Sequence, residues 1–173
     1  EQQNIEKFNL IVLPGVGAFC EGMKKLRDTK IILSIEQALN KNKNVLGICL
    51  GMQLLFEESE EFGATKGIGF FNGKVENFNK YNVEQQTFIG WNKVKFEKKK
   101  MLIQEEGLKK DLQNSTFYFV HSFFVKCKNK EIEVGASLNG KLNFSSIVKK
   151  NNVIAFQFHP EKSGHSGLIL LKN

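Results

Sequence analysis

Val45-Leu-Gly-Ile-Cys-Leu-Gly-Met-Gln-Leu-Leu-Phe56 is the stretch around which the rest of the chain is organised. An apolar run ends at Gly47-Ile-Cys49-Leu-Gly51, and apolar residues then recur at Met52, Leu55 and Phe56. The hydrophobic period therefore changes from that of a strand to that of a helix. Glycines flank the cysteine as G-x-C-x-G, the cysteine counterpart of a nucleophile elbow, in which missing Cβ atoms allow a sharp strand-to-helix turn. The pattern predicts that Cys49 lies on such an elbow.

A thiol on this elbow would face the positive end of a helix, which favours the thiolate, the form that attacks carbonyl carbons. The alternative is a buried structural cysteine, because free cysteine is among the most buried residue types. The elbow alone leaves both interpretations of Cys49 open.

Length and composition bound the class of protein. The 173 residues make one domain of ordinary size, and the hydrophobic fraction of 41% and charged fraction of 25% are typical of soluble globular proteins. No apolar run has membrane-spanning length and Glu1–Phe8 is polar, so we expect neither a membrane span nor a secretory signal peptide. The three cysteines form no C-x-x-C pair, and the histidines are scattered. We expect no disulfide framework and no metal site, and a reducing, cytoplasmic compartment fits best.

The net charge of +7 raises the question of nucleic-acid binding. The excess is lysine, and Arg27 is the only arginine in the sequence. Bidentate recognition of guanine edges depends on arginine, and no aromatic-basic RNA motif occurs. We therefore do not expect nucleic acid as a partner.

Hydrophobic periods predict alternating strands and helices in the first third of the chain. Strands are expected at Asn9–Leu13 and Asn44–Ile48, with a helix over 21–41 between them that breaks near Asp28. The helix after the elbow is expected to close at the acidic segment Glu57–Glu61. This order predicts a parallel sheet with crossover helices, in which ligands bind beyond the carboxyl ends of the strands.

The rest of the chain is expected to extend this sheet. Strands are predicted at Val75–Phe78, Gln86–Val94, Phe117–Val125 and Val153–Phe158, helices at Gln104–Leu112 and from Gly167 to Leu171, and an exposed turn at Lys98–Lys100. The predicted fold is one α/β domain with a mostly parallel, mixed central sheet flanked by helices.

Two further motifs follow predicted strands. Pro14-Gly-Val-Gly-Ala-Phe19 allows close approach of its backbone to a ligand, and either a phosphate or an oxyanion would suit it, although the Lys-Ser/Thr ending of a P-loop is absent. His159-Pro-Glu161 follows the last strand. Cysteine chemistry needs a nucleophile, a base and a group that orients the base. Cys49, His159 and Glu161 supply these three residue types at one edge of the predicted sheet.

Each of these residues also has a structural interpretation. Taken singly, His159 suits a hydrogen-bonded core histidine and Glu161 a surface carboxylate. The elbow, the glycine loop and the His-Pro-Glu segment all lie at the same edge of the predicted sheet, and this favours a catalytic site. His121 could face the same edge or be structural. We expect Cys20 and Cys127 to be inert and His165 to be an exposed loop residue.

Five separated motifs closely resemble the class I, triad-type glutamine amidotransferases. They occur in the family's order over nearly the whole chain, and within the family they match the glutaminase subunits of imidazole glycerol phosphate synthases. The resemblance implies that family's flavodoxin-like fold. The motifs are Pro14-Gly-Val-Gly-Ala-Phe19, Gly47-Ile-Cys-Leu-Gly-Met-Gln53, Gly90-Trp-Asn92, Tyr118-Phe-Val-His-Ser122 and Gln157-Phe-His-Pro-Glu-Lys-Ser163.

The resemblance implies hydrolysis of glutamine without a cofactor. Cys49 would attack the side-chain amide, and His159, oriented by Glu161, would protonate the departing ammonia. The oxyanion would be bound by Gly15, Val16, Gly17 and the N–H of Leu50. The amino-acid end of glutamine would be bound by Gln53 and by the backbone around Ser122 and Phe123. The implied partner is a (β/α)₈-barrel synthase subunit that receives the ammonia within a heterodimer.

The chain departs from the family pattern in two respects. The family begins with a further strand-helix unit, so we expect that this sequence lacks roughly 30 or more residues at its N-terminus. Phe88-Ile89 stands where members often have His-Met, and Phe144-Ser-Ser-Ile147 departs from a usual small, apolar run. Related subunits serve amidotransferases that act on surface-sugar precursors, which is the alternative function. A non-catalytic binding module and a cysteine protease are the alternatives from other classes, and the complete triad speaks against the first.

Overall fold

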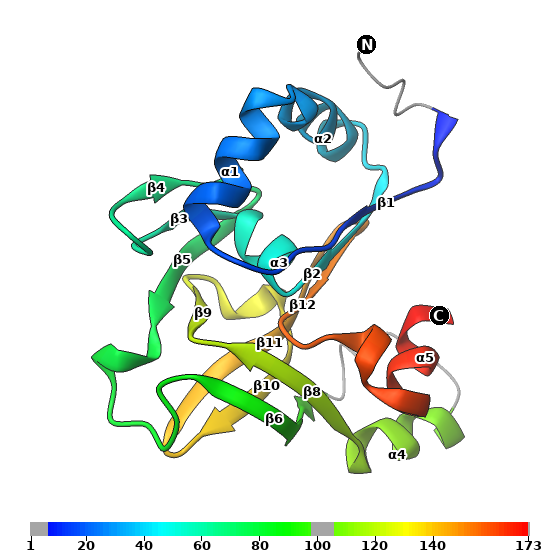
Figure 1. Ribbon diagram of the computed structural model, residues 1–173. Helices are drawn as coiled ribbons and strands as arrows, with labels where there is room; N and C mark the ends of the chain where they lie inside the picture. Colours follow the sequence, from blue (N-terminus) through cyan, green and yellow to red (C-terminus); the bar gives the residue numbers. More distant parts are fainter. Residues whose placement is uncertain (1–6, 98–105, 173) are drawn as a thin grey trace.

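A six-stranded mixed sheet lies at the centre of the computed structural model, which describes residues 7–97 and 106–172 (Figure 1). Its strands, in spatial order, are β1 (Leu10–Leu13), β2 (Asn44–Ile48), β12 (Val153–Phe156), β11 (Leu142–Lys150), β10 (Glu133–Asn139) and β7 (Lys95–Phe96). β1, β2 and β12 pair in parallel, and the other neighbours pair antiparallel. The predicted mixed α/β sheet is confirmed.

Within the central sheet, parallel pairing is confined to β1, β2 and β12, a smaller share than the sequence predicts. The reason lies in two tight connections: Gly140 has a φ of +60° between β10 and β11, and Asn151 has a φ of +53° between β11 and β12. In the second turn Lys150 pairs with Val153, so only Asn151 and Asn152 connect the strands. Such short loops join antiparallel strands, whereas a parallel pair needs a long crossover.

Two smaller sheets complete the fold. One consists of β4 (Thr65–Lys66), β3 (Phe56–Ser59), β5 (Phe71–Asn77) and β9 (Phe123–Cys127), and the other of β6 (Phe88–Lys93) and β8 (Thr116–His121). The predicted strand Phe117–Val125 is therefore divided at Ser122 into β8 and β9, which pair in different sheets.

The helix after the elbow is shorter than predicted. Helix α3 (Leu50–Leu54) ends before Phe56, and the segment Glu57–Glu61, expected to close the helix, belongs largely to β3. Phe56 is fully buried, and β3 pairs with β4 and β5. Periodicity cannot separate a short buried strand from a buried helical turn, so tertiary pairing decides this segment.

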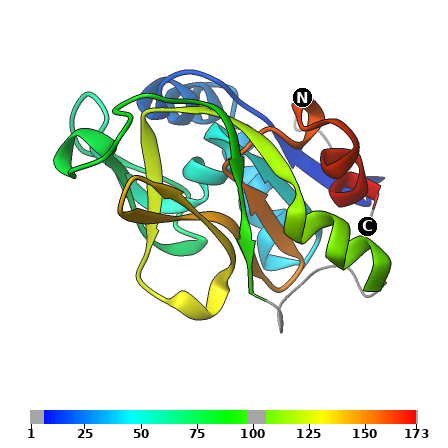
Figure 2. The ribbon, with the colours of Figure 1, turned by 90° about the horizontal axis from the view of Figure 1, so that it is seen from below.

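The other helices agree with the predicted positions. Helices α1 (Phe19–Asp28) and α2 (Ile31–Asn40) are separated at the predicted break. Helices α4 (Glu106–Asn114) and α5 (Gly164–Lys172) lie beside each other (Figure 2). Short 3₁₀ helices η2 (Phe78–Lys80) and η4 (Lys130–Ile132) connect strands, and η5 (Pro160–Lys162) connects β12 to α5. Lys98–Lys100 and the first residues of the predicted helix 104–112 lie outside the described residues. None of the helices in the described ranges is long and apolar enough to cross a membrane.

Side chains alternate along β2 and β12 and so build a core on each face of the central sheet. Leu46 and Phe156 belong to a cluster that includes α5, whereas Val45 and Ala155 belong to a cluster with α1 and α2 on the opposite face (Figure 1). This follows from the two-residue period of a strand. The strands that carry the elbow are thus held from both sides.

Gly51 permits the close packing of the elbow against the edge strand. A Cβ at position 51 would lie 1.7 Å from the carbonyl oxygen of Leu13. A Cβ on the helical Gly22 would instead lie 3.2 Å from a methyl group of Leu54. The first contact is with rigid backbone, and the second is with the flexible end of a side chain.

Gly51→Ala should lower the free energy of unfolding by about 3 kcal/mol or more, because the added methyl group forces the elbow away from β1. Gly22→Ala, a matched control within a helix, should have an effect within about 1 kcal/mol, since alanine also has the higher helix propensity. Urea denaturation of both variants measures the difference. Equal stabilities would contradict this account of the elbow.

Candidate active site

Cys49 occupies a strained elbow between β2 and α3. Its φ of +52° and ψ of −107° lie in a region that residues with a side chain rarely adopt. Its N–H donates to the carbonyl oxygen of Phe156 at 2.7 Å, and its own carbonyl accepts from the N–H of Gln53 at 3.2 Å. The predicted elbow is confirmed, and backbone hydrogen bonds on both sides hold its conformation.

His159 reaches the same edge of the sheet from the neighbouring strand. Ile48 and Phe156 are partners in the parallel pairing of β2 and β12, so the chain after each strand emerges at adjacent positions. The Nδ1 of His159 lies 2.7 Å from Oε1 of Glu161. A carboxylate only accepts, so Nδ1 carries the proton and Nε2 has a free lone pair. Within the described part of the chain, this buried Nε2 has no hydrogen-bond partner.

Ser163 fixes the backbone of His159, a role that the sequence analysis missed. Its hydroxyl donates to the carbonyl oxygen of His159 at 2.6 Å and accepts from the N–H of Tyr118 at 3.0 Å. The N–H of His159 donates to the carbonyl oxygen of Tyr118 at 2.9 Å. A serine four residues after the histidine, in a proline-initiated turn, is the signal that could have indicated this bond.

Burial raises the pKa of the Cys49 thiol to about 11. The N–H of Leu50 and the side chains of Gln157 and Lys162 act in the opposite direction, while the charge of Glu161 adds to the rise. The expectation that the elbow favours the thiolate is therefore wrong for this conformation. Desolvation exceeds the effect of a helix of only five residues. The thiol needs a base to lose its proton at neutral pH.

A pocket of about 620 Å³ opens beside Cys49. Six of the predicted oxyanion and substrate residues line it: Val16, Gly17, Leu50, Gln53, Ser122 and Phe123. Gly15 lies behind this wall, where its carbonyl oxygen accepts from the N–H of Leu50 at 3.3 Å. The predicted oxyanion donor of Leu50 is thus engaged by the glycine loop itself.

His121 and Gln53 share one acceptor at the bottom of this pocket. The carbonyl oxygen of Phe123 accepts from Nδ1 of His121 at 2.8 Å and from Nε2 of Gln53 at 2.9 Å. The imidazole of His121 packs among Phe78, Phe119 and other aromatic rings. Burial lowers its pKa to about 4, so the ring is neutral at pH 7. His121 lines the pocket and is also part of the core.

Three cysteine and histidine side chains that the sequence analysis considered lie away from the site. Cys127 is buried in β9, Cys20 lies in α1, and neither lines the pocket at Cys49. His165 is exposed as predicted, but it lies in the first turn of α5 rather than in a loop. Across residues 7–97 and 106–172, no group of three or more His, Cys, Asp or Glu side chains is arranged to hold a metal ion.

A family model for class-I glutamine amidotransferases matches residues 1–171 of the chain. The chain belongs to this family.

Curated relatives indicate which members of the family the chain is similar to. Imidazole glycerol phosphate synthase subunit HisH of Pyrococcus furiosus is 46% identical over 169 residues, which cover 98% of this chain and 82% of the relative. Subunit HisH 1 of Campylobacter jejuni strain 81-176 is 41% identical over 172 residues, which cover 99% and 82%.

Solved structures of amidotransferases share the fold. A crystal structure described as a glutamine amidotransferase has a TM-score of 0.66 at 19% identity and covers 99% of this chain and 80% of its own. PurLQS from Thermotoga maritima has a TM-score of 0.65 at 18% identity, with coverages of 94% and 76%. At these identities the comparison establishes the fold of this amidotransferase.

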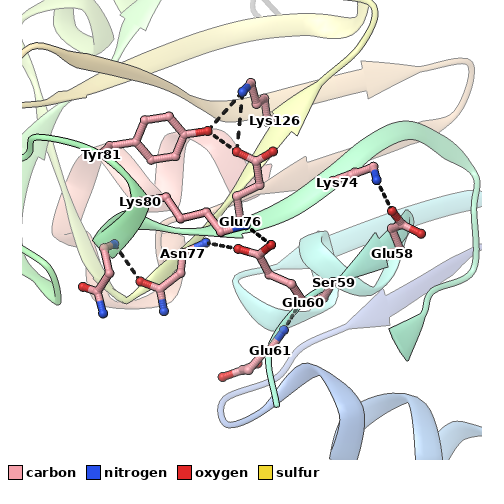
Figure 3. A network of polar contacts seen from close by, with 11 residues as sticks. Glu58, Ser59, Glu60, Glu61, Lys74, Glu76, Asn77, Lys80, Tyr81 and Lys126 are labelled. Carbon is pink, nitrogen blue, oxygen red and sulfur yellow. Dashed lines mark hydrogen bonds and ion pairs between the residues drawn. The ribbon is translucent and has the colours of Figure 1, made fainter. Parts of the chain in front are cut away.

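An ion-pair network lies beside Glu61 and Asn77, which line the wall of the amidotransferase pocket (Figure 3). Lys74 pairs with Glu58, Lys80 with Glu60, and Lys126 and Tyr81 with Glu76. These contacts join β3, β5, η2 and β9. All three lysines are largely exposed, so solvent screens these pairs and each contributes little to stability.

Glu61 continues this wall into the pocket. Its carboxylate accepts from the N–H of Phe19 at 2.7 Å and so caps helix α1, whose own N-cap residue, Ala18, provides no side-chain hydrogen bond. The acidic segment Glu57–Glu61, expected to close the helix after the elbow, therefore contributes a residue with a structural role at the pocket.

Stability should depend on pH through His121. Its pKa falls from an ordinary value of 6.5 to about 4 on folding, so the unfolded chain binds more protons between these values. The stability contributed by the neutral ring is complete above pH 6.5 and is lost as the pH falls toward 4, by about 3 kcal/mol in total.

His121→Phe should flatten this dependence. Urea denaturation from pH 4 to 7 should give the variant a shallower loss of stability than the native chain. His165→Asn, which removes an exposed histidine, should keep the native slope. A native slope in the His121→Phe variant would show that His121 is not the titrating group.

Proposed function

We propose that this chain is the glutaminase subunit of an imidazole glycerol phosphate synthase and acts in histidine biosynthesis. The observation that carries the proposal is the placement of Cys49 on a strained elbow beside the His159–Glu161 pair, at the ends of adjacent parallel strands. Relatives that carry this name are 38–46% identical over nearly the whole chain, which supports the choice of pathway.

In the proposed mechanism, His159 first acts as a base. Nε2 takes the proton of the Cys49 thiol, and the thiolate attacks the carbon of the glutamine side-chain amide. The charge of Glu161 stabilises the imidazolium that forms, because its carboxylate holds Nδ1–H at 2.7 Å. The proton then passes from Nε2 to the amide nitrogen, and ammonia leaves while a glutamyl thioester remains on Cys49. His159 next removes a proton from water, which hydrolyses the thioester to glutamate.

The proposed oxyanion donors are backbone groups of the glycine loop and of Leu50. An oxyanion that uses the N–H of Leu50 replaces the carbonyl oxygen of Gly15 as its acceptor. Gly15, Val16 and Gly17 therefore must shift when the tetrahedral intermediate forms. Gln53 and the backbone at Ser122 and Phe123 are the proposed contacts of the amino-acid end of glutamine.

The proposed partner is a (β/α)₈-barrel subunit in a cytoplasmic heterodimer with lyase activity. Ammonia released into water near neutral pH is mostly protonated and is then not a nucleophile. Direct transfer to a docked synthase avoids this loss. The alternative, a glutaminase for a surface-sugar precursor, is not favoured by relatives named as subunits of imidazole glycerol phosphate synthase.

Cys49→Ala should reduce glutamine-dependent ammonia production by more than about 1,000-fold, because no other group can form the thioester. Synthase activity driven by added ammonium should persist in the complex with the barrel subunit, since that route bypasses the thiol. Cys127→Ala, the control at another buried cysteine, should keep glutamine-dependent activity. Full activity of a folded Cys49→Ala variant would refute the proposed nucleophile.

The barrel of an imidazole glycerol phosphate synthase should stimulate ammonia release from glutamine. Release is measured for the chain alone and with the barrel and its acceptor ligand. The absence of stimulation, with Cys49 still labelled by a glutamine-analogue electrophile, would keep the glutaminase and reject the histidine pathway.

A further inference from the structure

A line of buried amides connects the pocket to the sulfur of Cys49. Gln157 is completely buried, and its Nε2 lies 3.8 Å from Sγ of Cys49. Its Oε1 lies 3.3 Å from Nε2 of Gln53, which in turn lies 2.9 Å from the carbonyl oxygen of Phe123. A side-chain amide in such a position needs its hydrogen bonds, because burial without them is costly.

The chemistry of these groups fixes which end of each amide faces which neighbour. The carbonyl oxygen of Phe123 can only accept, so the NH₂ group of Gln53 must face it. The second hydrogen of this NH₂ group is then available to an acceptor, and Oε1 of Gln157 is the atom within reach. Gln157 must therefore present its own NH₂ group to Cys49. Flipping either amide would leave two acceptors or two donors facing each other.

We propose that Gln157 is a further catalytic residue, whose Nε2–H donates to Sγ of Cys49 and stabilises the thiolate, and that Gln53 orients it. This inference rests on the proposed function of Cys49 as nucleophile. A hydrogen bond to an anion is about twice as strong as one between neutral groups, so the donor favours the reacting form of the thiol over its resting form. The relay also gives Gln53 a positioning role in addition to its proposed contact with glutamine.

The surroundings of Cys49 explain why such a donor is needed. The charges of Glu161 and Lys162, from the segment after β12 that also carries His159, act on the buried thiol. His121 at the end of β8 is neutral at pH 7, and Glu61 lines the pocket. Of the carboxylates, Glu161 acts directly against the thiolate. A neutral donor in contact with sulfur stabilises the anion without adding a further charge to a buried site.

Two variants separate the donor from the packing of the amide. Gln157→Glu keeps an oxygen for the NH₂ group of Gln53 and loses the donor toward Cys49. Gln157→Met removes both bonds and keeps the approximate volume. Ser137→Ala is the control, because Ser137 is equally buried and its hydroxyl donates to the carbonyl oxygen of Lys93, outside the pocket at Cys49.

The measurement is the rate of alkylation of Cys49 by iodoacetamide as a function of pH, quantified by peptide mass spectrometry on the full chain. In both Gln157 variants the rate at pH 7.5 should fall about tenfold and its midpoint should rise by about one pH unit. The Ser137→Ala variant should match the native profile. In the complex with the barrel, kcat for glutamine should fall while KM stays within about twofold.

A native alkylation midpoint in folded Gln157 variants would overturn the proposal. Alkylation needs no glutamine turnover, so this result would leave the proposed glutaminase function intact. If neither variant folds, the native chain still provides a test. The side-chain ¹⁵N–¹H signal of Gln157 should titrate with the same midpoint as alkylation, and a signal that does not move would equally overturn the proposal.

Discussion

The parallel pairing of β2 with β12 is the constraint on which the rest of the site depends. It places Ile48 beside Phe156, and the bond from the N–H of Cys49 to the Phe156 carbonyl extends the pairing past the end of the strand. Cys49 and the segment that carries His159 therefore leave the sheet at adjacent points. The pocket, the position of His159 and the contact of Gln157 with Cys49 all depend on this register. A shift of one residue would reverse the direction of every side chain in the strand.

The strain at Cys49 persists because the core on both faces of the sheet determines the backbone around it. A residue held in a rare backbone conformation costs about 1–3 kcal/mol, and that cost is tolerated where the surrounding structure fixes the conformation. Gly47 and Gly51 contribute by absence of side chains, since a Cβ at position 47 would lie 3.0 Å from Ala155 and one at 51 would meet Leu13. Dense packing, together with the backbone hydrogen bonds of Cys49 to Phe156 and Gln53, holds the thiol in place.

Much of this arrangement could be predicted from the sequence, because it follows from local signals. The change of period at Cys49, the glycines beside it and the His-Pro-Glu segment after an apolar strand indicated the elbow and the shared edge. The segment of β3 was predicted as the end of a helix, because tertiary pairing with β4 and β5 decides its structure. The β10–β11 hairpin around Gly140 was not predicted. The raised pKa of Cys49 and the contact with Gln157 depend on burial and on side chains distant in the sequence. Composition and motif spacing therefore do not predict this pKa or this contact.

The proposed mechanism requires that Cys49 forms a covalent bond to the glutamyl group during turnover. The most direct measurement is rapid acid quenching of the chain with glutamine and the synthase subunit, followed by mass spectrometry of the peptides. We expect one glutamyl thioester per chain, confined to the peptide that contains Cys49 and formed at the rate of ammonia release. Ammonia release with no adduct, or an adduct at Cys20 or Cys127, would contradict it.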